Sequence, residues 1–208
     1  MSATPRRALV VIDVQNEYVT GDLPIEYPDV QTSLANIGRA MDAARAAGVP
    51  IVVVQNLAPA ASPLFARGSD GAQLHPVVAS REHDHHVEKS LPSVFAQTDF
   101  ADWLASRNID TLTIVGYMTH NCDASTAFEA IHRGLKVEFL VDATGSVPYE
   151  NEAGFASAED IHRVFSVVMH SRFAAVATTE AWLAALAAGA PLPTGNIYAS
   201  NRKARAVA

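Results

Sequence analysis

Residues 115–135 read VGYMTHNCDASTAFEAIHRGL and contain Cys122, the single cysteine of the chain. The run TLTIVG leads into this stretch and has the apolar character of a buried strand. Gly134 closes the stretch, where a residue without a side chain can end a helix in a left-handed conformation. Between them, small and apolar residues recur at the i, i+3, i+4, i+7 spacing of an amphipathic helix: Ala124, Ala127, Phe128 and Ile131. The pattern predicts a strand, a tight turn and a helix, with the Cys122 thiol at or near the first helical turn.

This position makes Cys122 a candidate nucleophile. Backbone N–H groups in the first turn of a helix have no helical partners, and the helix dipole favours negative charge there. Both effects stabilise a thiolate, which is the reactive form of cysteine. The alternative is a small, buried, apolar cysteine, which is a common fate of free cysteines. The position of Cys122 alone does not decide between a nucleophile and a buried apolar residue. The other residues of the chain have to decide between them.

Composition limits the class of protein. The chain has 208 residues, of which 49% are hydrophobic and 18% are charged. This length is enough for one domain with a sizeable core, which we place at residues 1–190, with a C-terminal tail at 191–208. A net charge of −7 argues against an electrostatic nucleic-acid binder. Because there is one cysteine, no apolar run of about 18 residues and no signal-like N-terminus, we expect a cytoplasmic protein that does not enter a membrane.

Apolar runs alternate with helical patterns along the chain. Continuous apolar strands that are separated by helices are typical of a parallel sheet buried on both faces, so the sequence predicts a three-layer α/β domain. Residues 56–86 have no sustained period and are expected to be mostly loop, with room for a short helix. Residues 143–157 are also expected to be loop, and the basic tail could reach a neighbouring subunit or be disordered. Strands are predicted at 8–12, 51–55, 85–89, 111–115, 136–141 and 174–177, and further helices at 30–47, from 98 or 99, at 158–171 and at 178–188.

Three chemically active side chains follow predicted strands. Asp13 ends the first strand, Lys89 ends the third and Cys122 follows the fourth. The carboxyl ends of parallel strands meet at one edge of a sheet, which is where ligands bind in such folds. A carboxylate can take the proton of a thiol, and a lysine favours the thiolate. The set suits covalent hydrolysis of a carbonyl compound, although Asp13 could instead cap a loop and His120 could instead pair with Cys122.

Two other features of the sequence bear on whether the protein binds a cofactor. The run HDHH at 83–86 could bind a metal, but no partner ligands stand at finger or helical spacing, so a polar start of a strand is favoured. Neither a G-x-G-x-x-G nor a G-x-x-x-x-G-K-[ST] motif is present, so phosphate cradling is unsupported. We therefore expect neither a metal nor another cofactor.

Three segments together resemble one known family. They are DVQN at 13–16, VEKSLPSVFAQTDF at 87–100 and VGYMTHNCDASTAFEAIHRGLKV at 115–137. Their order and separations are similar to those of the isochorismatase-like cysteine hydrolases over about residues 6–190. The resemblance implies a Rossmann-like sheet of six parallel strands flanked by helices, and a homodimer or homotetramer.

The resemblance also implies a catalytic site. Asp13, Lys89 and Cys122 would form a triad. The peptide bond before Met118 would be cis, and the backbone N–H groups of Met118 and Cys122 would form an oxyanion hole. Several side chains are candidates for the wall of the substrate pocket, although core packing is the commoner fate of an aromatic residue: Asn16, Tyr18, Leu57, Phe65, Tyr117, His120 and Tyr149.

Two departures within the family narrow the expected reaction. Isochorismatases proper, which cleave a vinyl ether, lack the cysteine, so Cys122 favours hydrolysis of a C–N bond in a small amide, ureido compound or lactam. Nicotinamidases carry a D-x-H metal motif after the second strand, where this chain reads QNLAPA, so nicotinamide is not the first choice. The alternatives are hydrolysis of a non-amide bond, or a binding subunit without catalytic activity.

Overall fold

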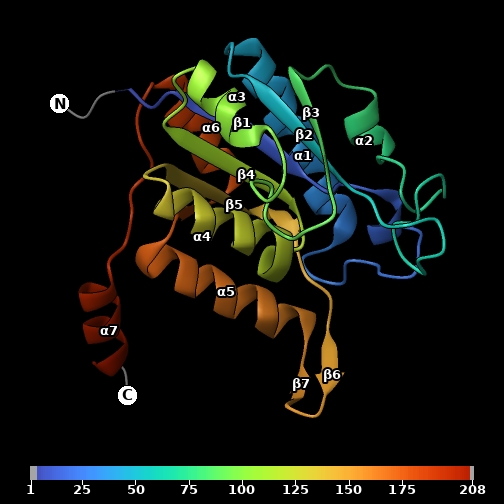
Figure 1. Ribbon diagram of the computed structural model, residues 1–208. Helices are drawn as coiled ribbons and strands as arrows, with labels where there is room; N and C mark the ends of the chain where they lie inside the picture. Colours follow the sequence, from blue (N-terminus) through green and yellow to red (C-terminus); the bar gives the residue numbers. More distant parts are fainter. Residues whose placement is uncertain (1–3, 207–208) are drawn as a thin grey trace.

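A computed structural model describes residues 4–206 and contains a central sheet of six parallel strands. The strands lie in the order β3-β2-β1-β4-β5-β8 (Figure 1). This order places β1 and β4 at the centre, so the residues that follow them lie next to each other at the carboxyl edge. The strands are β1 Arg7–Ile12, β2 Ile51–Asn56, β3 His85–Lys89, β4 Thr111–Tyr117, β5 Lys136–Gly145 and β8 Ala175–Ala177.

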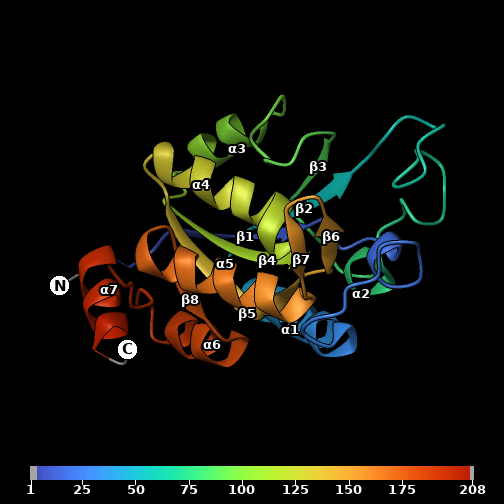
Figure 2. The same ribbon diagram turned by 90° about the horizontal axis from the view of Figure 1, so that it is seen from below.

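Helices cover both faces of this sheet. Figure 2 shows α3 and α4 on one side of the strands and α1 and α6 on the other, and α5 packs on the side of α4. Each face has its own apolar core, which gives the three layers predicted from the sequence. The helices are α1 Val30–Ala46, α2 Pro76–Ala79, α3 Phe100–Ser106, α4 Ala124–His132, α5 Ala158–Arg172, α6 Thr179–Ala187 and α7 Ile197–Arg205, with single turns η1 Asn16–Tyr18 and η2 Thr119–Asp123.

Strand β1 shows how the sequence pattern builds both cores. Leu9 and Val11 point into the core shared with α1 and α6, whereas Val10 and Ile12 point into the core shared with α3, α4 and α5. Side chains of a strand alternate between the two faces of a sheet, so a continuous apolar run is buried on both. Because both faces of β1 are buried, its apolar composition alone is enough to predict this strand.

The edge opposite the candidate site is held by a buried ion pair. Arg7 of β1 makes two hydrogen bonds of 2.8 Å to the carboxylate of Glu138 on β5. Thr113 and the Trp182 indole also donate to Glu138, at 2.9 and 3.0 Å. Because every charge in this group is paired, the amino ends of the strands can be buried without a lone ion.

The predicted fold class and the positions of the six main strands are confirmed. The prediction for the fifth strand was too short, because β5 continues past Asp142 to Gly145 after a register shift against β4. Asp142 lies within β5, and its carboxylate accepts two hydrogen bonds of 2.7 Å from Thr179, which holds the start of α6.

Two elements were missed by the sequence analysis. The expected loop at 143–157 contains a hairpin, β6 Tyr149–Asn151 and β7 Gly154–Ala156, whose strands of three residues are too short to show a strand pattern. The expected tail contains α7, which Asn196 caps by accepting a hydrogen bond of 2.8 Å from the Ala199 N–H. Its period was not recognised because α7 has no buried face. The division of the chain into a domain at 1–190 and a tail stays a prediction.

Within residues 4–206, no helix is both long enough and apolar enough to cross a membrane.

Candidate active site

The structure brings Asp13, Lys89 and Cys122 together at the carboxyl edge of the sheet. The Lys89 Nζ atom lies 2.6 Å from Asp13 Oδ2 and donates a hydrogen bond of 3.2 Å to Cys122 Sγ. All three residues are buried, with exposed fractions of 0% for Asp13, 4% for Lys89 and 6% for Cys122.

Gly116 allows this close assembly. Its φ angle is +117°, which a residue with a side chain rarely adopts, and an added Cβ would lie 2.0 Å from the carbonyl oxygen of Ile12. The end of β4 therefore runs directly against the end of β1. Asp13, which follows Ile12, itself has a φ of +51°, in the left-handed region. These backbone conformations at the ends of β1 and β4 bring the Asp13 carboxylate and the Cys122 thiol into one site.

The turn that carries Cys122 is tightly held. The Tyr117–Met118 peptide bond is cis, as expected. The Met118 carbonyl accepts hydrogen bonds from the N–H groups of Asn121 and Asp123, at 3.0 and 3.2 Å. Thr126 of α4 donates to the Cys122 carbonyl at 2.7 Å. Cys122 thus lies in a single π-helical turn, two residues before α4 begins, rather than within α4 itself.

The protonation states differ from the expectation drawn from the helix dipole. Burial and then the charge of Asp13 raise the pKa of the Cys122 thiol well above its usual value, and Lys89 opposes this only in part. Burial also raises the pKa of Asp13, against the opposing charge of Lys89. Burial lowers the pKa of Lys89, but the charges of Asp13 and Cys122 outweigh it and raise the pKa above its usual value. The thiol therefore has to lose its proton to react, and Lys89 favours the charged forms of both Cys122 and Asp13 against the effect of burial.

A polar residue two positions after Asp13 organises the long loop after β2. Gln15 donates to the carbonyls of Asn56 and Ala72, at 2.9 and 2.8 Å, and accepts from the Asn56 N–H at 2.9 Å. Asn16 donates to the Asp70 carbonyl at 3.2 Å. The loop contains one short helix, α2, as expected for 56–86. Asn16 therefore orients the loop; a pocket role for it stays a prediction.

The candidate wall residues fall into different environments. Tyr117 is completely buried, and its hydroxyl lies 2.7 Å from Ser33 Oγ of α1, so Tyr117 belongs to the core beneath the site rather than to an open wall. Tyr18 is also buried and packs between Tyr117 and Phe65. Leu57 lines an open hollow of about 390 Å³ that includes Ser90, the neighbour of Lys89. Of these side chains, Leu57 is the one that borders open space beside the cluster.

His120 is part of a hydrogen-bonded network near Cys122. Its Nδ1 atom lies 3.1 Å from Ser146 Oγ, and its Nε2 atom lies 3.0 Å from the Tyr149 hydroxyl. Burial, with a smaller effect of His162, lowers the pKa of His120 to about 4, so the ring is neutral at pH 7. The charge of Cys122 contributes to a raised pKa of Tyr149, after burial. The network therefore links the β6–β7 hairpin to the candidate site.

Asp123 was missed by the sequence analysis. It follows Cys122 directly, is completely buried, and neither carboxylate oxygen has a hydrogen-bond partner among residues 4–206. Burial, and then the charge of Asp13, raise its pKa well above the usual value. The signal that could have found it is an acidic residue at the start of an otherwise apolar helix face.

The polar run at 83–86 leads into strand β3. His85 begins β3, stacks on Trp103 with ring centres 5.1 Å apart, and contacts Asp99 at 3.0 Å. In the part of the chain that the structure describes, no group of three His, Cys, Asp or Glu side chains is arranged to hold a metal ion. The expectation that the protein uses no metal stays a prediction.

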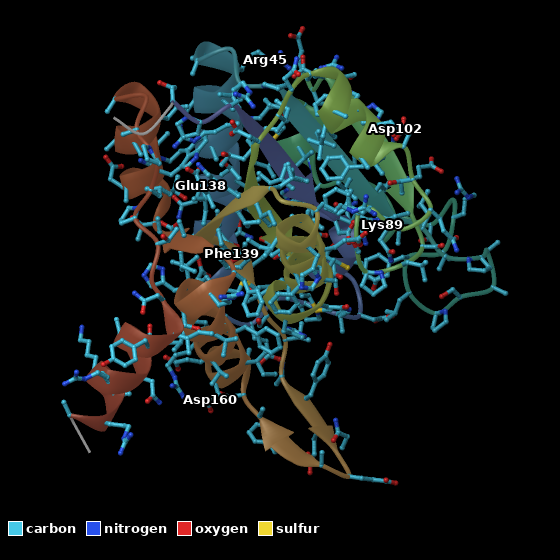
Figure 3. All side chains as sticks on the ribbon, turned by 60° about the vertical axis from the view of Figure 1, so that its left-hand side comes forward. Arg45, Lys89, Asp102, Glu138, Phe139 and Asp160 are labelled. Carbon is cyan, nitrogen blue, oxygen red and sulfur yellow. The ribbon has the colours of Figure 1, made fainter. Side chains whose placement is uncertain are left out.

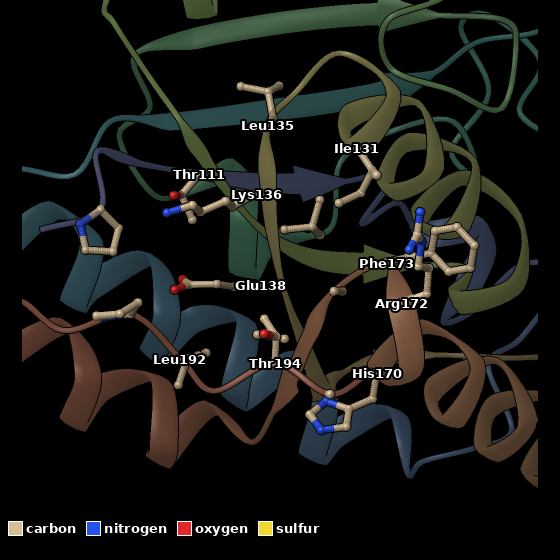
Figure 4. Close-up of a pocket in the computed structure, with 16 residues that line it drawn as sticks. Thr111, Ile131, Leu135, Lys136, Glu138, His170, Arg172, Phe173, Leu192 and Thr194 are labelled. Atoms are coloured by element: carbon tan, nitrogen blue, oxygen red, sulfur yellow. The ribbon is translucent and has the colours of Figure 1, made fainter. Parts of the chain in front are cut away.

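A separate cavity lies at the opposite edge of the sheet. It has a volume of about 200 Å³ and is lined by Thr111 and Lys136, which begin β4 and β5, and by Leu192 and Thr194 from the C-terminal segment (Figure 4). Figure 3 labels Lys89 and Glu138, which mark the two edges. Because this cavity is on the amino side of the strands, it is not part of the candidate site.

Comparison with known proteins gives consistent matches. The isochorismatase domain model matches residues 7–181. The crystal structure of a candidate isochorismatase from Burkholderia xenovorans LB400 is 77% identical, covers 98% of each chain and superposes with a TM-score of 0.98.

Two curated relatives are more distant. The secreted isochorismatase effector Isc1 of Verticillium dahliae is 35% identical over 144 residues, which are 69% of this chain and 75% of the relative. The ureidoacrylate amidohydrolase RutB of Pseudomonas syringae is 31% identical over 170 residues, which are 66% of this chain and 69% of the relative.

Proposed function

Because this chain belongs to the isochorismatase family of hydrolases, we propose that it hydrolyses a C–N bond of a small amide, ureido compound or lactam through a covalent intermediate on Cys122. The observation that carries this proposal is the contact of the Lys89 Nζ atom with both Asp13 and Cys122, at 2.6 and 3.2 Å. A relative named an amidohydrolase supports the choice of bond.

The first half of the reaction forms an acyl-enzyme. Asp13 takes the proton of the Cys122 thiol as the sulfur attacks the carbonyl carbon of the substrate. The oxyanion that forms is held by the backbone N–H groups of Met118 and Cys122, each worth about 3 kcal/mol in comparable sites. Asp13 then gives its proton to the leaving nitrogen, the C–N bond breaks, and an amine and a thioester remain.

The second half releases the acid. Asp13, again ionised, takes a proton from a water molecule that attacks the thioester carbonyl. The bond between carbon and sulfur breaks, and the proton returns to Cys122. The positive charge of Lys89 favours the ionised form of Asp13 at the start of each half-reaction, because it opposes the effect of burial on the carboxyl pKa.

The test is intact-protein mass spectrometry after incubation with a panel of small amides, ureido acids, lactams and vinyl ethers. The mass assignment is simple because Cys122 is the single cysteine. A substrate-dependent acyl adduct or product is expected with the unmutated protein and not with Cys122→Ala. The control is the melting temperature, which should differ little between the two proteins.

Two outcomes would overturn the proposal. Turnover by Cys122→Ala would remove the nucleophile from the mechanism. Product formed only from vinyl ethers would point to hydrolysis of a non-amide bond. If neither adduct nor product forms, and Cys122 reacts slowly even with a small alkylating agent, a binding subunit without catalytic activity would be the better description.

A further inference from the structure

The cavity at the amino edge of the sheet is enclosed by anchored segments. It lies between the starts of β4 and β5, the end of α5 and residues 191–195, and its volume is about 200 Å³ (Figure 4). Just before residues 191–195, the Ala190 carbonyl accepts a hydrogen bond of 2.6 Å from the Arg7 side chain. At the other end, an added Cβ at Gly195 would come 2.5 Å from the His170 carbonyl oxygen, so this segment lies directly against α5. The cavity is therefore a fixed feature of the fold.

The lining of this cavity is mainly apolar. Its larger apolar side chains come from α4, β5, α5 and the C-terminal segment, and the residues around them: Ile131, Leu135, Val137, Phe173 and Leu192. Sites for small molecules are typically apolar, with a few polar groups that fix the orientation of the ligand. Because the volume is below the range of roughly 300–1,000 Å³ that is usual for drug-sized ligands, only a molecule of about ten non-hydrogen atoms or fewer would fit.

The acidic side chain in the lining, Glu138, already has its partners. Its carboxylate accepts two hydrogen bonds of 2.8 Å from Arg7, and one each from Thr113 and Trp182, at 2.9 and 3.0 Å. Arg7 also balances the charge of Glu138. A ligand in the cavity therefore meets no uncompensated negative charge.

The basic side chains in the lining, in contrast, have no such partners. The chain has 15 Lys and Arg residues. Within residues 4–206, nine of them form ion pairs, and two more, Arg107 and Arg202, lie over aromatic rings. The four that do neither are Lys136, Arg172, Lys203 and Arg205. Two of these four, Lys136 and Arg172, line the cavity.

The two cations come from different walls of the cavity. Figure 4 shows Lys136 on β5 and Arg172 at the end of α5. Arg172 lies in the last turn of α5, where a positive charge also complements the helix dipole. That effect does not account for Lys136, which begins a strand. A ligand with a negative charge accounts for both.

His170 adds a hydrogen-bond donor to the same lining. Its Nδ1 atom accepts a hydrogen bond of 3.2 Å from the Val176 N–H, so the neutral ring carries its hydrogen on Nε2. The polar groups that remain available in the cavity are therefore cations and donors, which match a ligand that accepts hydrogen bonds.

A small organic acid has both required properties. We propose that this cavity is a second ligand site, which binds a small carboxylate with an apolar body and pairs its charge with Lys136 and Arg172. A phosphate fits less well, because the apolar walls leave several of its oxygens without partners. The site lies at the opposite edge of the sheet from Cys122, so it does not rest on the proposed reaction and the two can fail separately.

The first test is isothermal titration calorimetry with benzoate, which has nine non-hydrogen atoms. We expect one site per chain with a dissociation constant of about 1 mM or below, which a ligand of this size can reach. Benzyl alcohol has a similar shape and no charge, and should bind at least about tenfold more weakly. Inorganic phosphate should also bind more weakly than benzoate.

Two substitutions assign the charges. Lys136→Gln and Arg172→Gln should each raise the dissociation constant of benzoate about fivefold, and the double variant about 25-fold. The matched controls are Lys203→Gln and Arg205→Gln. They remove cations that also lack a partner within residues 4–206 but lie outside the cavity, so the dissociation constant should not change.

Hydrogen exchange measured by mass spectrometry gives the location of the bound benzoate. Saturating benzoate should slow exchange in peptides that cover 131–138 and 190–195, which line the cavity. Exchange in 117–126, the turn that carries Cys122, should not change. This comparison separates the cavity from the candidate active site, where an organic acid could bind as a reaction product.

Four results would overturn the proposal. The first two are the absence of saturable benzoate binding, and binding that Lys136→Gln and Arg172→Gln leave unchanged. The third is protection of 117–126 in place of the cavity peptides. The fourth is equal or tighter binding of benzyl alcohol or phosphate, which would indicate a purely apolar cavity or a general anion site.

Discussion

The Nζ atom of Lys89 lies 2.6 Å from Oδ2 of Asp13, and neither side chain is exposed to solvent. The pair connects the ends of β3 and β1, which lie on either side of β2. A buried ion pair adds little net stability, because desolvation offsets the attraction, but removal of one partner leaves an uncompensated charge. The position of Lys89 is therefore expected to matter for stability as well as for chemistry.

Lys89→Met should lower the free energy of unfolding by about 3 kcal/mol at pH 8, measured by urea denaturation. The loss should be smaller at pH 5. Without Lys89, the pKa of Asp13 rises further above its unfolded value, and such a group contributes stability at low pH that is lost as pH rises through the folded pKa.

The double variant Asp13→Asn/Lys89→Met is the control for this effect. It removes both charges, so it should be more stable at pH 8 than Lys89→Met and should show no added pH dependence. Equal losses for Lys89→Met at pH 5 and pH 8 would contradict a buried, titrating Asp13.

Gly116→Ala should be among the most damaging single changes in this chain. The new Cβ would meet the Ile12 carbonyl oxygen at 2.0 Å, and the φ angle of +117° is strained for any side chain. The Ile12 carbonyl is a backbone group and cannot rotate away, so β1 and β4 would have to separate. The free energy of unfolding should fall by more than about 4 kcal/mol. The measurement is the yield of folded protein and its urea midpoint.

Gly134→Ala is the matched control for Gly116→Ala. Gly134 also has a positive φ, of +82°, but no atom of residues 4–206 outside its immediate neighbours lies within 4 Å of an added Cβ. Gly134→Ala should lower the free energy of unfolding by about 1 kcal/mol, because only the backbone conformation becomes unfavourable. If the two alanine variants were equally stable, the close approach of β1 and β4 would not be a requirement of the fold.

Much of the architecture could be predicted because the residues that indicate each strand or helix lie close together in the sequence. The run at 8–12 is apolar on both faces, and the helix after Cys122 has a clear period, so the order of strands and helices followed from short windows. Asp13, Lys89 and Cys122 could be placed at one edge because the strands are parallel, and the structure brings them into contact.

The remaining features depend on contacts between distant residues. The raised pKa of the Cys122 thiol arises from burial and from Asp13, which is more than a hundred positions away in the chain. Tyr117 is one of the candidate wall residues, but alternation along β4 turns it toward Ser33 of α1. Helix α7 has no buried face, so a search for apolar periodicity could not find it.

His120 should make the protein less stable in mild acid. Its folded pKa is about 4, below the unfolded value near 6.5, so the stability that neutral His120 contributes is present above pH 6.5 and is lost as pH falls toward 4. The melting temperature should therefore fall through this window. His120→Gln should reduce the slope but not abolish it, because burial also lowers the pKa of His162. Identical curves for the two proteins would show that His120 titrates normally.

Asp123 should be harder to ionise than an exposed aspartate. Its two oxygens are buried and have no hydrogen-bond partner within residues 4–206, and burial, then the charge of Asp13, raise its pKa well above 3.8. A raised folded pKa gives stability that is complete below the unfolded pKa and is lost as pH rises.

Asp123→Asn has nearly the same shape and cannot ionise. The variant should therefore differ from the unmutated protein by about 1 kcal/mol or less at pH 5, and should gain on it as the pH rises. Urea denaturation at both pH values measures this difference. A constant difference between pH 5 and pH 9 would mean that Asp123 is ionised throughout and is stabilised by a partner such as Lys89.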